Sequence, residues 1–558
     1  MTLVYFILFI GPLIFVHELG HFLFAKLFDV KVLKFSLGFG PRAVGFRKGE
    51  TEYCVAWVPL GGYVKMLGED PNDEIRPEDQ GRAFNQKPLW QRYIVVLAGP
   101  AFNLLFPIII YFAFYASQTH LAPAVVGQAI AGWPAAEAGL EPGDRIAAID
   151  GKEVRYWYQM KDLIAGHTGE SLRFTIERDG QTFDRLIAPR EQVITNRLNM
   201  TEREGQIGIS QFYNPALVGV TPGSPAWRAG LRTGDEVTSV NGRAIDRWDQ
   251  LARVLRANSG QSLSLSFLRP TQAIDGVDLQ VLKPMITVVD PEPRTAEHRG
   301  AGKGKFRTGI RPAEFFVREV VSGSPAEKIG IRRGDWIARF DGKPVTYWHQ
   351  ITRSLRSKPK DKKIEEVEHS ITWITGDGKR RSGRFRLAKV TRIDEYKNKH
   401  PSYVFGAHNW RRPKSADPVP IQGRFTYAIS QAVQQTGEII GMMAIVVVQI
   451  FKRSIPADTI GGPLMLAYTA RAAAEKGPAQ FLWMLALISI NLGILNLLPI
   501  PILDGGHIMF FTIEAAKRRP LSLRAREIAS YVGLVLILSL LIFAFRNDIQ
   551  RYWSHWFE

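Results

Sequence analysis

Residues 3–21 of the chain read LVYFILFIGPLIFVHELGH, an uncharged apolar run that ends in the pattern HExxH. On a helix, His17 and His21 lie one turn apart on the same face, so both imidazoles can reach one metal ion. Glu18 is then placed to take a proton from metal-bound water. Ionisable groups inside a membrane segment are rare and usually functional. The stretch therefore predicts a metal-dependent hydrolytic site within a membrane-spanning helix.

Four apolar segments of about 20 residues are candidate membrane spans, at about 2–27, 93–116, 481–503 and 528–545. A shorter apolar run, 439–450, follows Gln434, Gln435 and Glu438, which favours an interfacial or partly embedded helix. The first span lacks the basic start and the cleavage site of a signal peptide, so we expect it to be retained.

The loops after the first and third spans are rich in Lys and Arg. The positive-inside bias places both loops in the cytoplasm, with the region from about 121 to 422 and both termini outside. The net charge of +18 comes from dispersed residues, and no nucleic-acid-binding motif accompanies it. We therefore expect the partner of this charge to be the lipid bilayer and no nucleic acid. The single cysteine, Cys54, excludes an internal disulfide and a cysteine-based zinc site.

The polar middle of the chain contains a threefold repeat. Gly-Asp pairs occur at 143–144, 234–235 and 334–335, and an Asx-Gly pair and a Trp-x-Gln follow each of them at matching distances. Each copy predicts a short helix ending at Gly, a turn, a strand, an Asx-Gly turn and a second helix. This order resembles the PDZ domain of bacterial proteases, which binds a peptide as an added strand and often captures its C-terminus. The alternative for any copy is that it only spaces or braces the others.

The repeat and the spans together suggest six regions. The first is an N-terminal membrane part with the HExxH span, a hairpin loop and the second span, and the last is a C-terminal membrane part. In chain order we expect the N-terminal membrane part at 1–120, PDZ-like copies at 121–205, 206–292 and 306–395, a linker at 396–425, and the C-terminal membrane part at 426–558.

A second chemical motif ends the third span, where residues 491–507 read NLGILNLLPIPILDGGH. Two prolines break the helix, and a carboxylate, Asp504, follows the apolar run. A hydrolytic zinc site needs three protein ligands and an open position for water. Asp504 is the obvious third ligand beside the two histidines, and His507 is the alternative.

The two motifs, HExxH at 17–21 and NxxPxPxLDGG at 496–506, closely resemble those of the site-2 protease family of intramembrane zinc metalloproteases. Residues 61–66 (GGYVKM) and 98–103 (AGPAFN) extend the resemblance along the chain. The nearest branch is the bacterial one that releases envelope stress sigma factors. Its members typically have one or two PDZ domains, whereas this chain has three candidate copies.

The resemblance implies that one zinc ion is bound by three side chains, His17, His21 and Asp504. Glu18 would be the general base and later the proton donor to the leaving amine. Asn496 would hold the substrate backbone near the metal, with Pro499 and Pro501 also in the substrate-binding set. The alternative role for Asn496 is a hydrogen bond between packed helices.

Residues 32–66 have a glycine-interrupted alternation that predicts a hairpin or small sheet. In the family, a similar element dips into the membrane beside the active site. An unwound substrate helix needs new backbone partners, and an edge strand would supply them. The alternative is a surface hairpin on the cytoplasmic side.

The expected fold is thus a polytopic α-helical membrane protein with about four transmembrane helices, a membrane-associated β-hairpin and an insert of three PDZ-like α+β domains. The resemblance implies a zinc metalloendopeptidase of the bacterial inner membrane, with the PDZ-like domains on the periplasmic side. Its substrates would be transmembrane segments of pre-trimmed single-pass proteins, such as an anti-sigma factor or remnant signal peptides. Peptide C-termini are possible ligands of the PDZ-like copies. The competing hypothesis is a catalytically inactive, membrane-anchored PDZ scaffold.

Overall fold

The computed structural model describes residues 2–70, 73–195, 201–272, 280–293, 306–345, 348–356, 367–393, 399–410, 413–452, 461–519 and 521–556. The chain divides into two compact units. The first, here called the helical unit, comprises Met1–Thr119, Ile393–Asn398 and Pro420–Glu558. The second, the module unit, comprises His120–Arg392 and Lys399–Val419.

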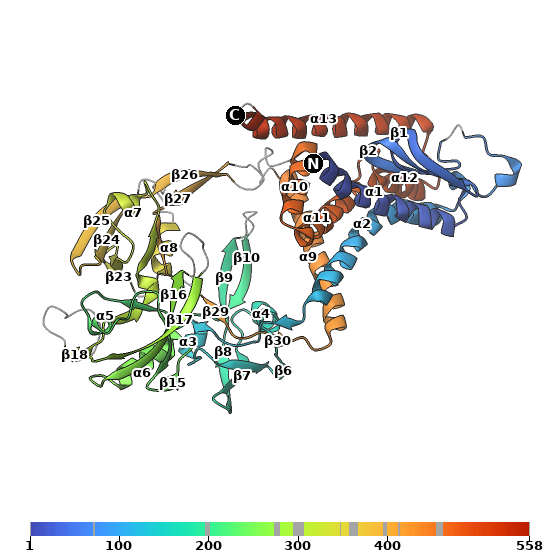
Figure 1. Ribbon diagram of the computed structural model, residues 1–558. Coiled ribbons are helices and arrows are strands. Elements are labelled where there is room, and N and C mark those ends of the chain that lie inside the picture. The colour runs from blue at the N-terminus through green and yellow to red at the C-terminus, as the bar shows by residue number, and fades with distance from the viewer. Residues whose placement is uncertain are drawn as a thin grey trace. The chain divides into compact units, whose positions relative to one another are not determined.

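The described residues of the helical unit form seven α-helices (Figure 1): α1 (Thr2–Leu27), α2 (Leu89–Ser117), α9 (Arg424–Phe451), α10 (Pro463–Glu475), α11 (Pro478–Asn496), α12 (Asp504–Lys517) and α13 (Leu523–Trp556). Five of these, α1, α2, α9, α11 and α13, are long and apolar enough to cross a membrane. The four predicted spans fall on α1, α2, α11 and α13. The third span is shorter than we predicted, since α11 ends at Asn496 and a turn with two prolines replaces its last residues.

The apolar run 439–450 is part of a longer helix than its sequence suggests. Helix α9 has 28 residues and begins at Arg424, so the polar residues before the run are helical as well. Ala432 and Ile439 are buried in a core shared with Ile110 and Tyr111 of α2. The first half of α9 therefore packs along the second half of α2.

Helices α1 and α2 approach each other closely at a glycine. A Cβ atom on Gly20 of α1 would lie 2.4 Å from the carbonyl oxygen of Ala98 of α2, so no other residue fits there without displacing backbone. Nearby, Phe9 and Leu13 of α1 are fully buried against residues of α2 and α11. The contact between Gly20 and Ala98 sets the distance between the two helices at the level of the HExxH motif.

The segment between α1 and α2 forms the predicted hairpin, with strands β1 (Val32–Lys48) and β2 (Thr51–Met66). The hairpin bends back on itself. Lys34–Leu37 pairs with Gly62–Lys65 and also with Glu52–Val55, which in turn pairs with Val44–Arg47. The two elements thus make a small sheet in which Gly62–Met66 is an edge strand.

The turn of the hairpin is tied to the end of α1 by charged groups. Glu50 lies 2.6 Å from the Lys26 ammonium and accepts two hydrogen bonds from Arg82, each 3.0 Å long. The Arg82 guanidinium and the Lys26 ammonium hold the pKa of the Glu50 carboxyl at about 2, well below its usual value. The hairpin is therefore held at this end of α1 by an ionised carboxylate.

Replacing Glu50 by Gln should lower the melting temperature of the detergent-solubilised protein near neutral pH. A carboxyl whose folded pKa is depressed stabilises the fold fully above its unfolded pKa of about 4.5, and this contribution is lost as the pH falls toward about 2. We expect a cost of about 1 kcal/mol near pH 7, because solvent screens the partly exposed pair. Thermal unfolding should show a difference near pH 3 that is less than half of this cost; an equal difference at both pH values would contradict the assignment.

The module unit contains three four-stranded sheets with one topology. Their strand orders are β6-β5-β7-β8, β15-β14-β16-β17 and β23-β22-β24-β25. The strands are β5 (Arg145–Ile149), β6 (Lys152–Glu153), β7 (Leu172–Arg178), β8 (Gln181–Ile187), β14 (Glu236–Val240), β15 (Arg243–Ala244), β16 (Leu263–Gln272), β17 (Gln280–Val289), β22 (Trp336–Phe340), β23 (Lys343–Pro344), β24 (Glu368–Ile374) and β25 (Arg380–Arg386). Each sheet has its own hydrophobic core.

Two helices accompany each sheet: α3 (Pro134–Glu137) and α4 (Trp157–Ala165), α5 (Pro225–Arg228) and α6 (Trp248–Ala257), and α7 (Pro325–Lys328) and α8 (His349–Arg356). The Asx residue of each Asx-Gly turn has a positive φ, and its side chain accepts a backbone N–H from the neighbouring strand. These residues are Asp150, Asn241 and Asp341. The predicted order of helix, turn, strand, turn and helix is therefore confirmed in all three copies.

A late strand completes each module. β11 (Ile209–Ser210) pairs with β4 (Gln128–Ala129), β20 (Ile310–Pro312) with β13 (Val218–Val220), and β28 (Ala407–Asn409) with β21 (Val317–Val320). Each completing strand lies beyond the boundary that the sequence suggested for its copy. The expected linker, 396–425, accordingly contributes β28 to the third module, because non-local strand pairing leaves no mark on local sequence.

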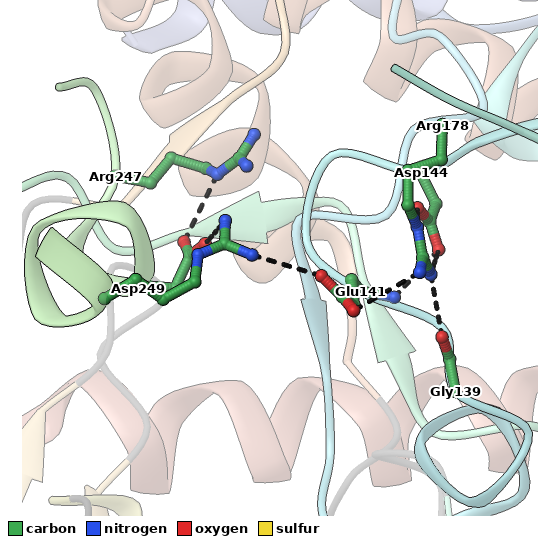
Figure 2. Close-up of polar contacts among 7 residues, drawn as sticks. Gly139, Glu141, Asp144, Arg178, Arg247 and Asp249 are labelled. Carbon is green, nitrogen blue, oxygen red and sulfur yellow. Dashed lines mark hydrogen bonds and ion pairs between the residues drawn. The ribbon is translucent and has the colours of Figure 1, made fainter. Parts of the chain in front are cut away.

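Charged side chains connect the first two modules (Figure 2). Arg178 binds Asp144 and the carbonyl oxygen of Gly139 within the first module. Glu141, in the same loop, accepts hydrogen bonds from Arg178 and from Arg253 of helix α6, each 3.2 Å long. Exposed pairs of this kind contribute little stability, so they add little to the attachment of one module to the other.

Candidate metal centre

Three side chains that can bind a metal converge where α1 meets the start of α12. Nε2 of His17 lies 3.2 Å from Oδ2 of Asp504, and Nε2 of His21 lies 3.5 Å from Oδ1 of the same residue. The two imidazole Nε2 atoms are 3.2 Å apart. Within the part of the chain that the structure describes, this is the one group of His, Cys, Asp or Glu side chains found to be placed for a metal ion. The structure thus brings the three predicted ligands together.

The spacing of these atoms fits zinc. Four ligands arranged tetrahedrally at about 2.0–2.2 Å from zinc lie about 3.3–3.6 Å from one another. The two Nε2 atoms are 3.2 Å apart, and each lies 3.2 or 3.5 Å from one of the two Asp504 carboxylate oxygens. Two imidazoles and one carboxylate also leave the fourth position for water, as hydrolytic zinc sites require.

The turn between α11 and α12 presents Asp504 to the histidines. A Cβ on Gly505 would lie 2.2 Å from the Leu498 carbonyl oxygen, so the start of α12 packs directly on the backbone of the turn. Ile502 has a φ of +97°, a rare conformation for a β-branched residue and one that costs about 1–3 kcal/mol. The surrounding backbone therefore holds the segment before Asp504 in a strained shape.

Glu18 lies beside the ligands on α1 and is buried. Gly62, in the edge strand of the hairpin, faces it, since a Cβ on Gly62 would lie 3.0 Å from Cγ of Glu18 and 2.7 Å from the Ser36 carbonyl oxygen. The edge strand and the predicted general base are therefore neighbours.

Helix α2 supports His21 in a way that the sequence did not reveal. Nδ1 of His21 lies 2.8 Å from the carbonyl oxygen of Val95. Gly99, one turn further along α2, faces the same ring, and a Cβ there would lie 2.2 Å from Nε2. The sequence indicates the stretch 98–103 only as part of the family resemblance, because its role depends on which helix packs against it.

The other predicted residues lie nearby but differ in what they contact. Asn496, at the end of α11, has its side-chain nitrogen 3.5 Å from Nδ1 of His17. Pro499 and Pro501 lie in the turn that follows, where the Pro501 backbone also contacts Gly533 of α13 and Gly506. His507 is not in the convergent group, so the structure favours Asp504 as the third ligand.

Comparison with known families identifies the chain. The model of peptidase family M50 matches residues 5–540. The chain belongs to this family. The match covers the helical unit on both sides of the modules and includes both chemical motifs.

Individual relatives are similar over nearly their whole length. The regulator of sigma-E protease RseP of Escherichia coli K12 is 28% identical over 558 residues, covering 98% of each chain. The regulator of sigma E protease of Haemophilus influenzae is also 28% identical, over 559 residues and 98% of each chain. A Vibrio cholerae protein provisionally named a zinc metalloprotease is 28% identical over 553 residues and 98% of each chain. These matches confirm the predicted family and the predicted class of enzyme, a peptidase, and the protein is an integral membrane protein.

Among solved structures, the PDZ domain of an SdrC-like protein from Listeria monocytogenes matches 17% of this chain and 90% of its own, with 19% identity and a TM-score of 0.13. The score is too low to support an argument about the modules.

Gly99 gives a direct test of the metal centre. Replacing Gly99 by Ala should place a methyl group against the His21 imidazole and weaken zinc retention about 10-fold or more. Replacing Gly11 by Ala is the matched control, because no heavy atom lies within 4 Å of the added methyl group. Zinc content after dialysis against a chelator measures both variants. Equal retention by the two would contradict the placement of His21.

Proposed function

We propose that the chain is an intramembrane zinc metalloprotease that cleaves transmembrane segments of pre-trimmed single-pass membrane proteins. The observation that carries this proposal is the convergence of His17, His21 and Asp504 beside the buried Glu18, among helices apolar enough to span a membrane. The names of the relatives, which describe zinc metalloproteases and regulators of sigma-E, support it. One zinc ion is enough for this ligand set.

Each residue has a distinct part in the proposed reaction. Bound by His17, His21 and Asp504, zinc would supply Lewis acidity and lower the pKa of water at the site. Glu18 is placed to take a proton from the attacking water and to deliver a proton to the leaving amine. The Asn496 amide, half-buried at the end of α11, is within reach of the site and donates a hydrogen bond to the substrate backbone.

The hairpin is the proposed substrate platform. Its edge strand, Gly62–Met66, starts beside Glu18. Peptide bonds of a substrate helix are inaccessible until the helix unwinds, and strand addition to this edge supplies the freed backbone with hydrogen-bond partners. Large apolar side chains of the hairpin are more than half exposed, as expected for lipid contact: Val44, Phe46, Val55 and Trp57.

The site also constrains how the chain crosses the membrane. Asp504 follows the C-terminal end of α11 and meets histidines in the C-terminal half of α1, so α1 and α11 cross in the same direction. Helix α2 runs back between them, since Val95 lies near His21 and Asn103 near His17. The chain between the end of α2 and the start of α11 therefore makes no net crossing of the membrane. We infer four crossings, with α9 embedded and α10 returning the chain.

The orientation follows from loop charge. The basic segments that follow α1 and α12 lie in the cytoplasm, and the module unit lies on the outer side, which is the periplasm if the membrane is a bacterial inner membrane. The three modules are PDZ-like, and each completing strand follows a glycine with positive φ: Gly208, Gly309 and Gly406. Such turns suit the capture of a peptide C-terminus by backbone N–H groups. The modules would exclude untrimmed substrates or bind newly made ends, and anti-sigma factors and remnant signal peptides are the substrate classes that we favour.

The competing function is an inactive membrane-anchored scaffold with a structural metal. A structural zinc site is closed by four protein ligands, whereas three convergent ligands and an adjacent carboxylate are typical of a hydrolytic site. The ligand set therefore favours the enzyme.

The test is cleavage of a tagged, pre-trimmed single-pass protein by the purified zinc-loaded chain, beside its Glu18→Gln variant. We expect cleavage by the native chain and a rate about 10²–10⁴-fold lower in the variant, because proton transfer by a positioned side chain is worth that much. The zinc content of both proteins is the control. Equal rates with equal zinc would refute the proposed role of Glu18, and no cleavage by either would favour the scaffold.

A further inference from the structure

We propose that Asn103 is a positioning residue for the metal site, and that its side-chain oxygen accepts a hydrogen bond from Nδ1 of His17. This inference rests on the proposed function, because it concerns how the same site holds its metal. Asn103 lies on α2 and is fully buried. Its carboxamide nitrogen is placed 3.2 Å from Nδ1 of His17.

The tautomer of His17 decides which end of the carboxamide faces the ring. Nε2 of His17 is the atom that points to Asp504 and to His21. A neutral imidazole that binds a metal through Nε2 carries its proton on Nδ1. Nδ1 is therefore a donor in the metal-bound protein, and a carboxamide NH₂ group cannot be its partner.

The Asn103 side chain itself shows the same mismatch. With the nitrogen toward His17, the oxygen Oδ1 is buried without a hydrogen-bond partner. This orientation suits only a ring whose proton is on Nε2, and that ring cannot bind zinc. The two ends of a carboxamide have nearly the same shape, so hydrogen bonds decide its orientation. Turning the amide brings the oxygen to the ring N–H and moves the NH₂ group to the place where the oxygen has no partner, so the tautomer of His17, and not the count of unpaired atoms, decides the orientation.

His21 already has the kind of partner that we propose for His17, a hydrogen-bond acceptor at Nδ1. Its Nδ1 already faces an acceptor, the carbonyl oxygen of Val95, at 2.8 Å. Val95, Gly99 and Asn103 are spaced one helical turn apart on α2, and His17 and His21 are one turn apart on α1. One face of α2 therefore serves both rings: Val95 and Gly99 meet His21, and Asn103 meets His17.

Asn103 is also fixed in place. Its backbone oxygen accepts a 2.7 Å hydrogen bond from the hydroxyl of Ser489 on α11, and both residues are fully buried. A fully enclosed acceptor fixes the ring more firmly than a half-buried one. Asn496, which is half-buried and 3.5 Å from the same nitrogen, is then left to meet the substrate. The two asparagines have separate tasks.

The test compares two replacements of similar size in the full chain. Asn103→Leu removes the acceptor, and Asn103→Asp keeps an oxygen in its place. We expect the Leu variant to release zinc to a chelator about 10–100-fold faster than the native chain, as is usual when the partner of a ligating histidine is lost. The Asp variant should release zinc no faster than about twice the native rate, and so should Asn496→Leu, the control on the other side of the ring.

Further measurements separate this role from simple packing. The melting temperatures of the zinc-free proteins show whether each variant is folded, and Asn103→Ala replaces Asn103→Leu if the larger side chain prevents folding. The ¹⁵N shifts of the labelled histidines report the tautomer of His17 with zinc bound. Equal zinc release by all variants, or equal loss in the Asp and Leu variants, would overturn the proposal. Native protein that binds no zinc would instead refute the proposed function, so the two failures are distinguishable.

Discussion

Two imidazoles and a carboxylate lie close together among apolar helices. Burying such ionisable groups costs free energy, and the packing of the helical unit has to offset that cost. A buried ionisable group is tolerated when it is paired or bound to a metal. His17, His21 and Asp504 meet this condition only if α1, α2 and the turn after α11 hold fixed distances. The glycines at these contacts follow from that requirement, because a Cβ on Gly20, Gly99 or Gly505 would overlap a neighbouring group.

The module unit is built from three similar modules. Each module has its own core and the same Asx turn, and a late strand from further along the chain pairs with it. The first two modules also share a buried carboxylate paired with an arginine, Asp144 with Arg178 and Asp235 with Arg269. The third module differs from them at another position. There His369 is buried beside Asp341, whereas the first two modules bury Leu172 and Leu263. The copies are therefore alike in topology and different in chemistry.

Much of the site could be predicted from the sequence, because its ligands lie in two short motifs whose spacing fixes their geometry. The hairpin and the repeat could also be predicted, since their sequence patterns are local. Asn103 and Gly99 could not be assigned roles in this way, because those roles arise from the packing of α2 against α1. The completing strands could not be predicted for a similar reason, since β28 is separated in sequence from its partner β21 by the whole of the module. The start of α9 was missed because polar residues, including Gln434 and Glu438, interrupt its apolar pattern.

Under the proposed function, the sides of α1 that are already occupied limit where a substrate can approach. Helix α2 closes one side, where the backbones touch at Gly20 and the His21 ring fills the space beside Gly99. The turn before Asp504 closes a second side, because its carboxylate must reach both histidines. On a further side, the edge strand of the hairpin meets Glu18 at Gly62. An edge strand binds extended chain and not helix, so under the proposed function a substrate helix that reaches Glu18 on this side would have to unwind.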